Sequence, residues 1–324
     1  MATLTPLALS RAQILAHRRT VGALDERLPR GARSLEIAAW AGLQDSMPRA
    51  ALLSIHARVS GTQPSTWEDP ALVQLWGPRF SAYVIAARDR AVFTLGRLPE
   101  DARGLALAQD MAARLAAHLA GRRMTYGEAG DALGVPPNQL RYAAPTGTVL
   151  MRWDGARHPV IWAVPEPGVA PAFAQLELAR RYLHVFGPTT APAFAKWAGI
   201  GPAQGRTAFD GLAGELLHVQ TPIGHASILR TDEAGFRATP SPAAAARLLP
   251  SGDAYFLLHG ADRELLVQDA GRRPLLWTSR VWPGALLVDG EVVGTWRRAN
   301  STLSIQPWRH TQPAPRGDAN ALSR

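Results

Sequence analysis

The feature of this sequence that most constrains its fold is a unit of helix, glycine turn and helix that occurs three times. Residues 124–147 and 189–211 align at an offset of 65, which pairs Gly134 with Gly199. Residues 34–59 have the same shape, with a glycine between two helix-forming runs. Self-similarity along a chain indicates repeated architecture more strongly than local propensity does. We therefore expect three copies of one helical module.

Strand signals follow each unit. After the second unit, two apolar runs flank Asp154-Gly155, a dipeptide suited to a tight hairpin turn. After the third, a run turns at residues 222–224, and after the first, three apolar-rich runs occur within residues 73–96. Amphipathic helices are expected at 105–119 and 173–183, and a capping box at Ser10 and Gln13. This is the order of a winged helix, so the sequence predicts three tandem winged-helix units, at residues 8–100, 101–165 and 170–232.

The chain beyond the third unit has a different pattern. Proline and alanine crowd residues 239–245, which we interpret as a linker. Short apolar runs then recur at roughly ten-residue spacing, which is typical of a small antiparallel sheet or barrel. The expected strands lie at residues 254–260, 264–269, 275–290, 291–298 and 301–308. The predicted fold class is α+β, with a C-terminal antiparallel β-barrel or sheet at residues 246–310 and a disordered tail at 311–324.

The positive charge of the chain is almost entirely arginine. The formal net charge is +9, and Lys196 is the single lysine among 35 basic residues. A planar guanidinium group makes paired hydrogen bonds to phosphate oxygens and guanine edges, so this composition suits nucleic acid. A GC-rich codon pool explains the same composition, because it raises arginine, alanine, glycine and proline together. Composition alone leaves both interpretations open.

Basic residues also recur at particular places in the units. Three arginines each follow a turn glycine by seven positions, near the expected start of the second helix, which enters the major groove in helix–turn–helix proteins. Three further basic residues flank the Asp154-Gly155 turn, where a hairpin can lie along the DNA backbone. The alternatives are surface arginines that do not touch DNA and an ordinary solvated turn. The candidate DNA contacts are Arg49, Arg141, Arg206, Arg152, Arg157 and His158.

Several classes of chemistry are excluded or disfavoured. The chain has no cysteine, which rules out disulfides, thiolate nucleophiles and iron–sulfur clusters. It has no P-loop, dinucleotide-binding or GxSxG motif, and its histidines lack metal-ligand spacing, so we expect neither a cofactor nor a metal. The polar group of Asp253, His259, Asp262 and Glu264 fits turn and salt-bridge roles. Without a long apolar run or a Sec-type signal sequence, we expect no membrane span and a cytoplasmic location.

The run GLQDSMPRAALLSIHARV at residues 42–59 resembles the signature of the AlkZ/YcaQ-type winged-helix family. That family includes DNA glycosylases that excise alkylated bases and unhook interstrand crosslinks. Further similar segments follow along the chain, namely DPALVQLWGPR, RYAAPTGTVLMRWDG, ELARRYLHVFGP, LLPSGDAYFLLHGADR and GALLVDGEVVGTWRR. The resemblance implies tandem winged helices with a C-terminal barrel. It also implies a double-stranded DNA substrate that carries an N7-alkylated purine or a crosslink.

The resemblance further implies a mechanism. N7-alkylation places a positive charge on the purine, so the base leaves readily and the protein need only hold a water at the anomeric carbon. In the family, two side chains spaced two residues apart hold this water. Gln44 matches the first, Ser46 stands where a second Gln or an Asp is expected, and Asp45 is the adjacent charged candidate. The alternative role of Ser46 is to cap the following helix.

These observations predict a monomeric DNA-binding winged-helix protein that acts as a DNA glycosylase on N7-alkylated purines or crosslinks. The alternative is a non-catalytic winged-helix DNA-binding protein or transcriptional regulator, which would prefer one sequence over random duplex by a large ratio. A third possibility is a protein-interaction scaffold. Salt dependence separates the scaffold from the other two, because phosphate contacts make DNA affinity fall steeply with salt.

Overall fold

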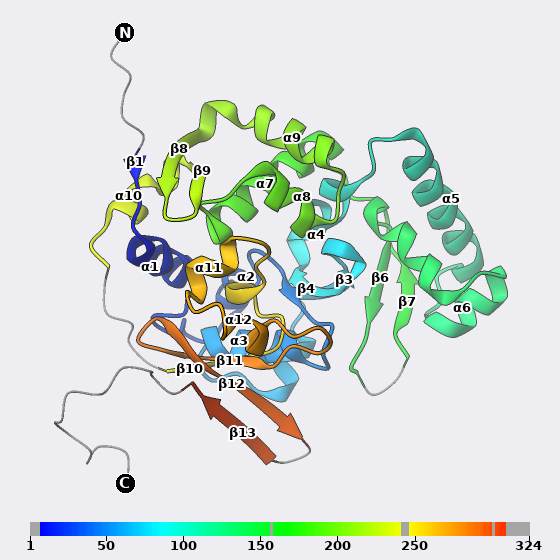
Figure 1. Ribbon diagram of the computed structural model, residues 1–324. Helices are drawn as coiled ribbons and strands as arrows, with labels where there is room; N and C mark the ends of the chain where they lie inside the picture. Colours follow the sequence, from blue (N-terminus) through cyan, green and yellow to red (C-terminus); the bar gives the residue numbers. More distant parts are fainter. Residues whose placement is uncertain (1–6, 156–157, 241–245, 300–301, 309–324) are drawn as a thin grey trace, which may run out of the picture.

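The computed structural model describes residues 7–155, 158–240, 246–299 and 302–308. Within these ranges the strands form four separate sheets, three with three strands and one with four (Figure 1). The architecture is therefore mixed α+β, as predicted. None of the helices in the described ranges is long and apolar enough to cross a membrane. The predicted tail at residues 311–324 and most of the predicted linker lie outside the described residues.

The first predicted unit begins with the helix α1 (Arg11–Val21), whose capping box between Ser10 and Gln13 is confirmed. Its other elements include α2 (Ala32–Ala38), β2 (Leu43–Gln44), α3 (Ala50–Arg58), β3 (Leu72–Trp76) and β4 (Ala82–Ala86). The sheet order is β2-β4-β3, and Gln44 lies opposite Tyr83. The apolar run at residues 91–96 is helical, within α4 (Arg90–Thr94) and the 3-10 turn after it, so only two of the three runs expected after this unit are strands.

The second unit lies at one end of the molecule (Figure 1). Its elements are α5 (Ala102–Leu119), β5 (Met124–Thr125), α6 (Tyr126–Leu133), β6 (Val149–Arg152) and β7 (Val160–Ala163), with sheet order β5-β7-β6. The predicted apolar stripe of α5 is confirmed, since Leu115 and Leu119 are fully buried. Gly134 ends α6 with a φ of 64°, a left-handed conformation that favours glycine. The helix after the Gly134 turn is a 3-10 helix, η5 (Pro137–Thr146), and contains Pro145, which has no N–H to donate.

The third unit receives a strand from the far end of the chain. Its elements are α7 (Pro171–Phe186), α8 (Ala191–Ala198), α9 (Pro202–Gly211), β8 (Leu216–Thr221) and β9 (Gly224–Leu229), followed by α10 (Glu233–Arg237). Strand β1 (Leu7–Ala8) pairs in parallel with β8, which gives the order β1-β8-β9. Gly199 ends α8 with a φ of 73°. The N-terminal segment thus completes a sheet whose other strands lie more than 200 residues away.

The C-terminal region is an open sheet, so the alternative of a closed barrel is wrong. Its strands are β10 (Arg247–Leu249), β11 (Gly284–Val288), β12 (Glu291–Ala299) and β13 (Thr302–Pro307). They pair antiparallel in the linear order β10-β11-β12-β13, which leaves β10 and β13 at the two edges. Two predicted strands are instead partly helical, in η8 (Ala254–Phe256) and α11 (Asp262–Leu266). The strand predicted at residues 275–290 begins in the helix α12 (Arg273–Leu276) and is a strand only in β11. Apolar runs this short do not distinguish a strand from a buried helical turn.

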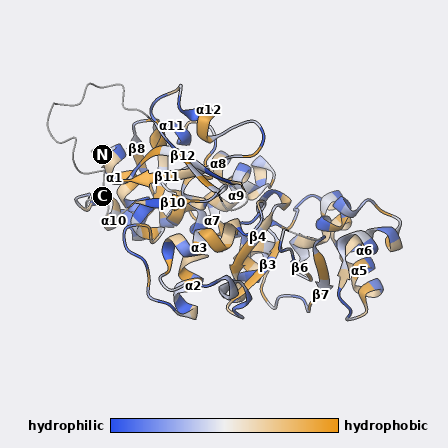
Figure 2. Ribbon diagram, turned by 90° about the horizontal axis from the view of Figure 1, so that it is seen from below, coloured by the Kyte–Doolittle hydropathy of each residue, from blue (hydrophilic) through white to orange (hydrophobic). Residues whose placement is uncertain are grey.

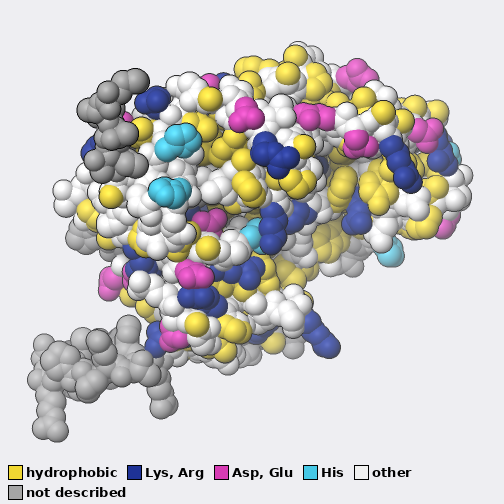
Figure 3. All heavy atoms as spheres, turned by 45° about the horizontal axis from the view of Figure 1, so that its top comes forward, with side chains coloured by type: hydrophobic (Ala, Val, Ile, Leu, Met, Phe, Trp, Pro, Cys, Tyr) yellow, Lys and Arg dark blue, Asp and Glu magenta, His cyan; other side chains and the backbone are white. Residues whose placement is uncertain are grey.

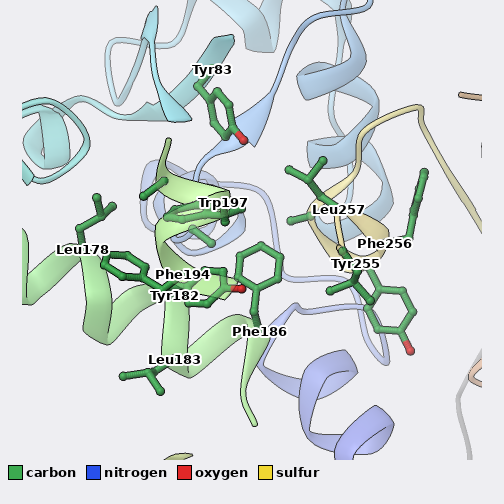
Figure 4. Packing of buried hydrophobic residues seen from close by; sticks show 14 of the residues in the cluster. Tyr83, Leu178, Tyr182, Leu183, Phe186, Phe194, Trp197, Tyr255, Phe256 and Leu257 are labelled. Atoms are coloured by element: carbon green, nitrogen blue, oxygen red, sulfur yellow. The ribbon is translucent and has the colours of Figure 1, made fainter. Parts of the chain in front are cut away.

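One large core joins segments from distant parts of the sequence. Tyr83 from β4, Trp197 from α8 and Phe256 from η8 belong to the same buried cluster (Figure 4). The sheet strands and the inward helix faces are largely hydrophobic in Figure 2. Because the first unit, the third unit and the C-terminal region share this core, their facing loops are held in fixed positions. The residues at that junction form the candidate site.

Candidate active site

Gln44 lies at the end of β2, at the junction of the first unit, the third unit and the C-terminal region. Its Oε1 accepts a hydrogen bond from Nη2 of Arg79 at 3.0 Å, and its Nε2 donates to Oγ of Ser46 at 3.0 Å. The backbone of Gly252 approaches the same amide, since a Cβ there would lie 3.6 Å from Cδ of Gln44. Gln44 is half-buried and Ser46 is exposed. The structure therefore brings together the two residues proposed to hold a water and orients the amide between them.

Asp45 points in a different direction, into the protein. It is completely buried, and its Oδ1 accepts a hydrogen bond from the Ala51 N–H at 3.0 Å. Asp45 therefore caps α3, and the expectation that Ser46 does so is wrong, because α3 begins only at Ala50. Burial raises the pKa of Asp45 to about 7, although the hydrogen bonds from Ala51 and Gln74 oppose the rise. Asp45 therefore holds the loop that carries Gln44 and Ser46 from its buried side, through the hydrogen bond to α3.

Gln74 connects this cap to the second unit, and the sequence contained no signal for it. Its Nε2 donates to Oδ2 of Asp45 at 2.7 Å and to the carbonyl of Trp153 at 3.3 Å. Its Oε1 accepts from the Trp153 N–H at 2.5 Å. Gln74 is almost fully buried on β3. The position of the α3 cap thus depends on where the β6–β7 hairpin begins its turn.

Arg79 is the second residue of the candidate site that sequence reasoning missed. It lies in η2 (Pro78–Phe80), just after β3, with a left-handed φ of 55°. Besides its bond to Gln44, its Nη1 donates to the carbonyl of Trp197 at 3.1 Å and lies 3.4 Å from Nε2 of His259. Its backbone packs closely on Gly199, where a Cβ would lie only 2.8 Å from the Arg79 nitrogen. Arg79 therefore ties Gln44 to α8 and to the C-terminal region.

The three arginines predicted to lead the second helices do not occupy equivalent places. Arg49 precedes α3 as its N-cap, with a left-handed φ of 60°. Arg141 and Arg206 are instead each the fifth residue of their helices, η5 and α9. The first unit differs because β2 and the Asp45 cap occupy the segment between its glycine and its second helix. Arg49 and Arg206 are exposed, whereas Arg141 is half-buried, 5.7 Å from the centre of the Phe80 ring.

The hairpin candidates lie next to the first unit. Arg152 stacks 4.6 Å over the ring of Trp67 and donates to its carbonyl at 3.0 Å. Burial lowers the pKa of Arg152; the charges of Glu68 and Asp45 oppose this effect, and those of Arg123 and Arg49 add to it. His158 is exposed, and Arg157 lies outside the described residues. The structure thus packs Arg152 on Trp67, places Arg49 before α3 and leaves Arg206 on a separate helix.

A cleft of about 780 Å³ separates the start of α3 from the C-terminal sheet. Met47, Pro48 and Leu53 line one side, and Trp282 and Arg297 line the other. The turn at Asp154-Gly155 closes one end, and a Cβ on Gly155 would collide with Pro48. The cleft is next to the exposed loop that carries Ser46, so it offers space for a nucleotide beside the site.

One group of side chains in the described part of the chain could hold a metal ion. His17, His184 and Asp232 each offer a ligand atom, and these atoms lie within 4.8 Å of one another. Nδ1 of His184 lies 2.9 Å from Asp232, and burial lowers the pKa of His17 to about 4. Sequence spacing did not indicate this group, because its members come from α1, α7 and the turn before α10. It lies apart from Gln44.

The fold is shared with a DNA glycosylase of known structure. The chain is similar to the DNA glycosylase AlkZ of Streptomyces sahachiroi, with a TM-score of 0.77 over 95% of this chain and 93% of that chain. The sequences are 19% identical, so this likeness shows the common fold.

The chain belongs to the AlkZ-like DNA glycosylase family, because the family model described as DNA glycosylase AlkZ-like matches residues 37–324. A curated relative is the interstrand DNA cross-link repair glycosylase of Streptomyces sahachiroi, which is 28% identical over 143 residues. This match covers 42% of the present chain and 37% of the length of that relative. The family resemblance predicted from the sequence is confirmed.

Proposed function

We propose that this protein is a DNA glycosylase that hydrolyses the N-glycosidic bond of an N7-alkylated purine, alone or within an interstrand crosslink. The observation that carries the proposal is the fixed pair of Gln44 and Ser46, joined by a 3.0 Å hydrogen bond in the loop that leads to Met47 in the wall of the cleft. Membership of the AlkZ-like family and the name of the curated relative support the same reaction.

The reaction needs little from the protein beyond positioning. Alkylation at N7 already makes the purine cationic, so it leaves as a neutral base when the C1′–N9 bond breaks and the electron pair passes to the ring. The water oxygen forms the new bond to C1′ and releases one proton to solvent. Holding that water at the anomeric carbon converts a two-body encounter into a pre-oriented attack.

Gln44 and Ser46 can hold the water without a strong base. One lone pair of Gln44 Oε1 accepts from Arg79, and the other is free to accept a water proton. Oγ of Ser46 accepts from Gln44 and keeps a hydroxyl proton and a lone pair for the same water. The shorter serine side chain suits a water that lies close to the backbone of the loop. Asp45 acts as a positioning residue, because its buried carboxylate holds the loop through α3.

We further propose that the three helical units are winged helices that bind double-stranded DNA, and that the protein acts as a monomer. In each unit, helices precede a pair of antiparallel strands, and a third strand from earlier in the chain completes the sheet, which supports this assignment. Arg49, which lines the 780 Å³ cleft, and Arg152, which ends the strand before the Asp154-Gly155 end of that cleft, are the strongest candidates for phosphate contact. Arg141, Arg157, His158 and Arg206 are further candidates for the same role.

Single-turnover excision of N7-methylguanine from duplex DNA tests the function. Alanine at Gln44 should slow excision by about 100-fold or more, because it removes a group that positions the nucleophile. Alanine at Gln109, an exposed glutamine on α5, is the matched control and should leave the rate unchanged. If the unaltered protein binds this DNA but releases the base no faster than the uncatalysed reaction, the proposed glycosylase activity is refuted.

One observation favours the alternative of a non-catalytic DNA-binding protein. The second position of the family's pair is a serine, and the neighbouring carboxylate of Asp45 is buried away from Gln44. A regulator should bind one selected sequence far more tightly than random duplex, by about 10³-fold or more. A repair protein should instead bind lesion-containing duplex in preference to intact duplex of the same sequence.

A further inference from the structure

A second cleft, of about 280 Å³, lies on the other side of Arg79 from Gln44. Thr190 and Lys196 of α8 line one wall, and His225, His259 and Gly260 line the other. Lys196 and His225 are exposed at its mouth, and His259 is half-buried. In Figure 3, dark-blue basic and magenta acidic side chains are interspersed around a cyan histidine near the middle of the face in view.

Lys196 lines the second cleft, and the charges of Arg79 and Arg263 also reach His259 in its wall. Arg79, Lys196 and Arg263 all act electrostatically on His259, and Nη1 of Arg79 lies 3.4 Å from its ring. None of these three cations forms a salt bridge within the part of the chain that the structure describes. The one carboxylate that lines the cleft, Asp262, lies 4.0 Å from Arg18.

The histidine in the cleft lies among these cations. Burial lowers the pKa of His259 to about 4, and the nearby charges of Arg79, Arg263 and Lys196 lower it in the same direction. At neutral pH its ring is therefore uncharged, and it can donate one N–H to a bound anion. The charges of the surrounding cations would attract that anion.

We propose that this second cleft binds one backbone phosphate of duplex DNA, with Lys196 as the principal charged contact. The choice of DNA as the ligand rests on the proposed function. The cleft includes α8, the first helix of the third helix–turn–helix, and in such motifs the first helix crosses the DNA backbone. Arg79 joins the cleft to the site, since one guanidinium nitrogen faces His259 and the other holds Gln44. A phosphate here would place the DNA strand in register with Gln44.

Fluorescence anisotropy with intact, unmodified duplex tests the proposal. Lys196→Gln should weaken binding several-fold and reduce the slope of log affinity against log salt by about 0.9, the value for one phosphate contact. Lys196→Arg should restore both. The matched control is Arg237→Gln, which removes one exposed charge from α10 at the opposite side of the third unit. Unchanged affinity and slope in Lys196→Gln would overturn the proposal.

A second experiment distinguishes a DNA phosphate from a free phosphate ion as the ligand of the cleft. Inorganic phosphate is titrated into the protein without DNA, and binding is followed by the shift in melting temperature. Stabilisation by inorganic phosphate that is lost in Lys196→Gln, with no change in the DNA salt slope, would assign the cleft to a free anion and overturn DNA as the ligand. The anisotropy test uses intact duplex and measures binding alone. Failure of the protein to excise a lesion would therefore refute the proposed function without affecting the result for the cleft.

Discussion

Replacing Arg58 by methionine should destabilise the protein by about 3 to 5 kcal/mol, because it leaves a buried carboxylate without its partner. Nη1 and Nη2 of Arg58 donate to the two oxygens of Asp253 at 2.7 and 2.8 Å. The side chains are 3% and 0% exposed. Ser54 also donates to Asp253, at 2.7 Å, so the pair fastens α3 to the segment that carries Gly252. That segment is the one that packs on Gln44.

The magnitude follows from the geometry. With the charge centres about 4 Å apart and an effective dielectric constant of about 20, the attraction is about 4 kcal/mol. Methionine fills most of the space of the arginine stem but supplies neither charge nor donors. The double variant Arg58→Met with Asp253→Asn removes both charges, so it should cost no more than the worse of the two single changes. If the two residues did not interact, the free-energy costs of the two single changes would add in the double variant.

The effect should also depend on pH. Burial alone raises the pKa of Asp253, but the charge and hydrogen bonds of Arg58, with those of Ser54 and the Tyr255 N–H, outweigh it and hold the pKa below its usual value. The pair therefore contributes stability above about pH 4, and that stability is lost as the pH falls through the depressed pKa. Without Arg58, burial dominates and the carboxyl prefers to be protonated. The stability deficit of Arg58→Met should shrink between pH 7.5 and pH 4.5.

Urea denaturation followed by tryptophan fluorescence measures these free energies. Arg237→Met, which breaks the exposed pair of Arg237 and Glu233, is the control and should cost less than about 1 kcal/mol. An Arg58→Met deficit that is below 1 kcal/mol, or that grows as the pH falls, would refute the reasoning. Additive single changes would refute the coupling of the two charges.

Two other predictions concern the residues behind Gln44. Gly199→Ala should destabilise the protein by at least about 1 kcal/mol, because φ is +73° and the new Cβ would press on the backbone of Arg79. Gly201→Ala, which meets open space, is the control, and equal melting temperatures would contradict the prediction. Asp45 has its pKa raised to about 7 by burial, so its contribution to stability should fall by about 4 kcal/mol as the pH rises from about 4 to above 7. Wild type should lose stability relative to Asp45→Asn across that range in urea titrations, and a gain would show that the sign is wrong.

Features that depend on neighbouring residues were predictable from the sequence. The capping box at Ser10 and Gln13, the apolar stripe of α5 and the β6–β7 hairpin occur as expected. The tight turn predicted at Asp154-Gly155 is wrong, because the hairpin pairs Arg152 with Val160 and the connection between them is longer than two residues. Each confirmed feature involves residues within a few positions of one another, so spacing and residue type contain the necessary information. Gln44 and Ser46 were found in the same way, through a motif that is continuous in the chain.

Features that depend on contacts between distant segments were not predictable. The sequence by itself determined the helical units, the glycine turns, the family and the Gln44 motif, because these are local patterns. Only the tertiary structure decided that Arg79 holds Gln44, that Asp45 caps α3 with help from Gln74, and that β1 completes a sheet with β8. It also decided that the apolar runs at residues 254–260 and 264–269 contain helical turns. The physical reason is that these outcomes depend on which buried surfaces pack against each other in the shared core. The spacing of residues along the chain does not contain that information.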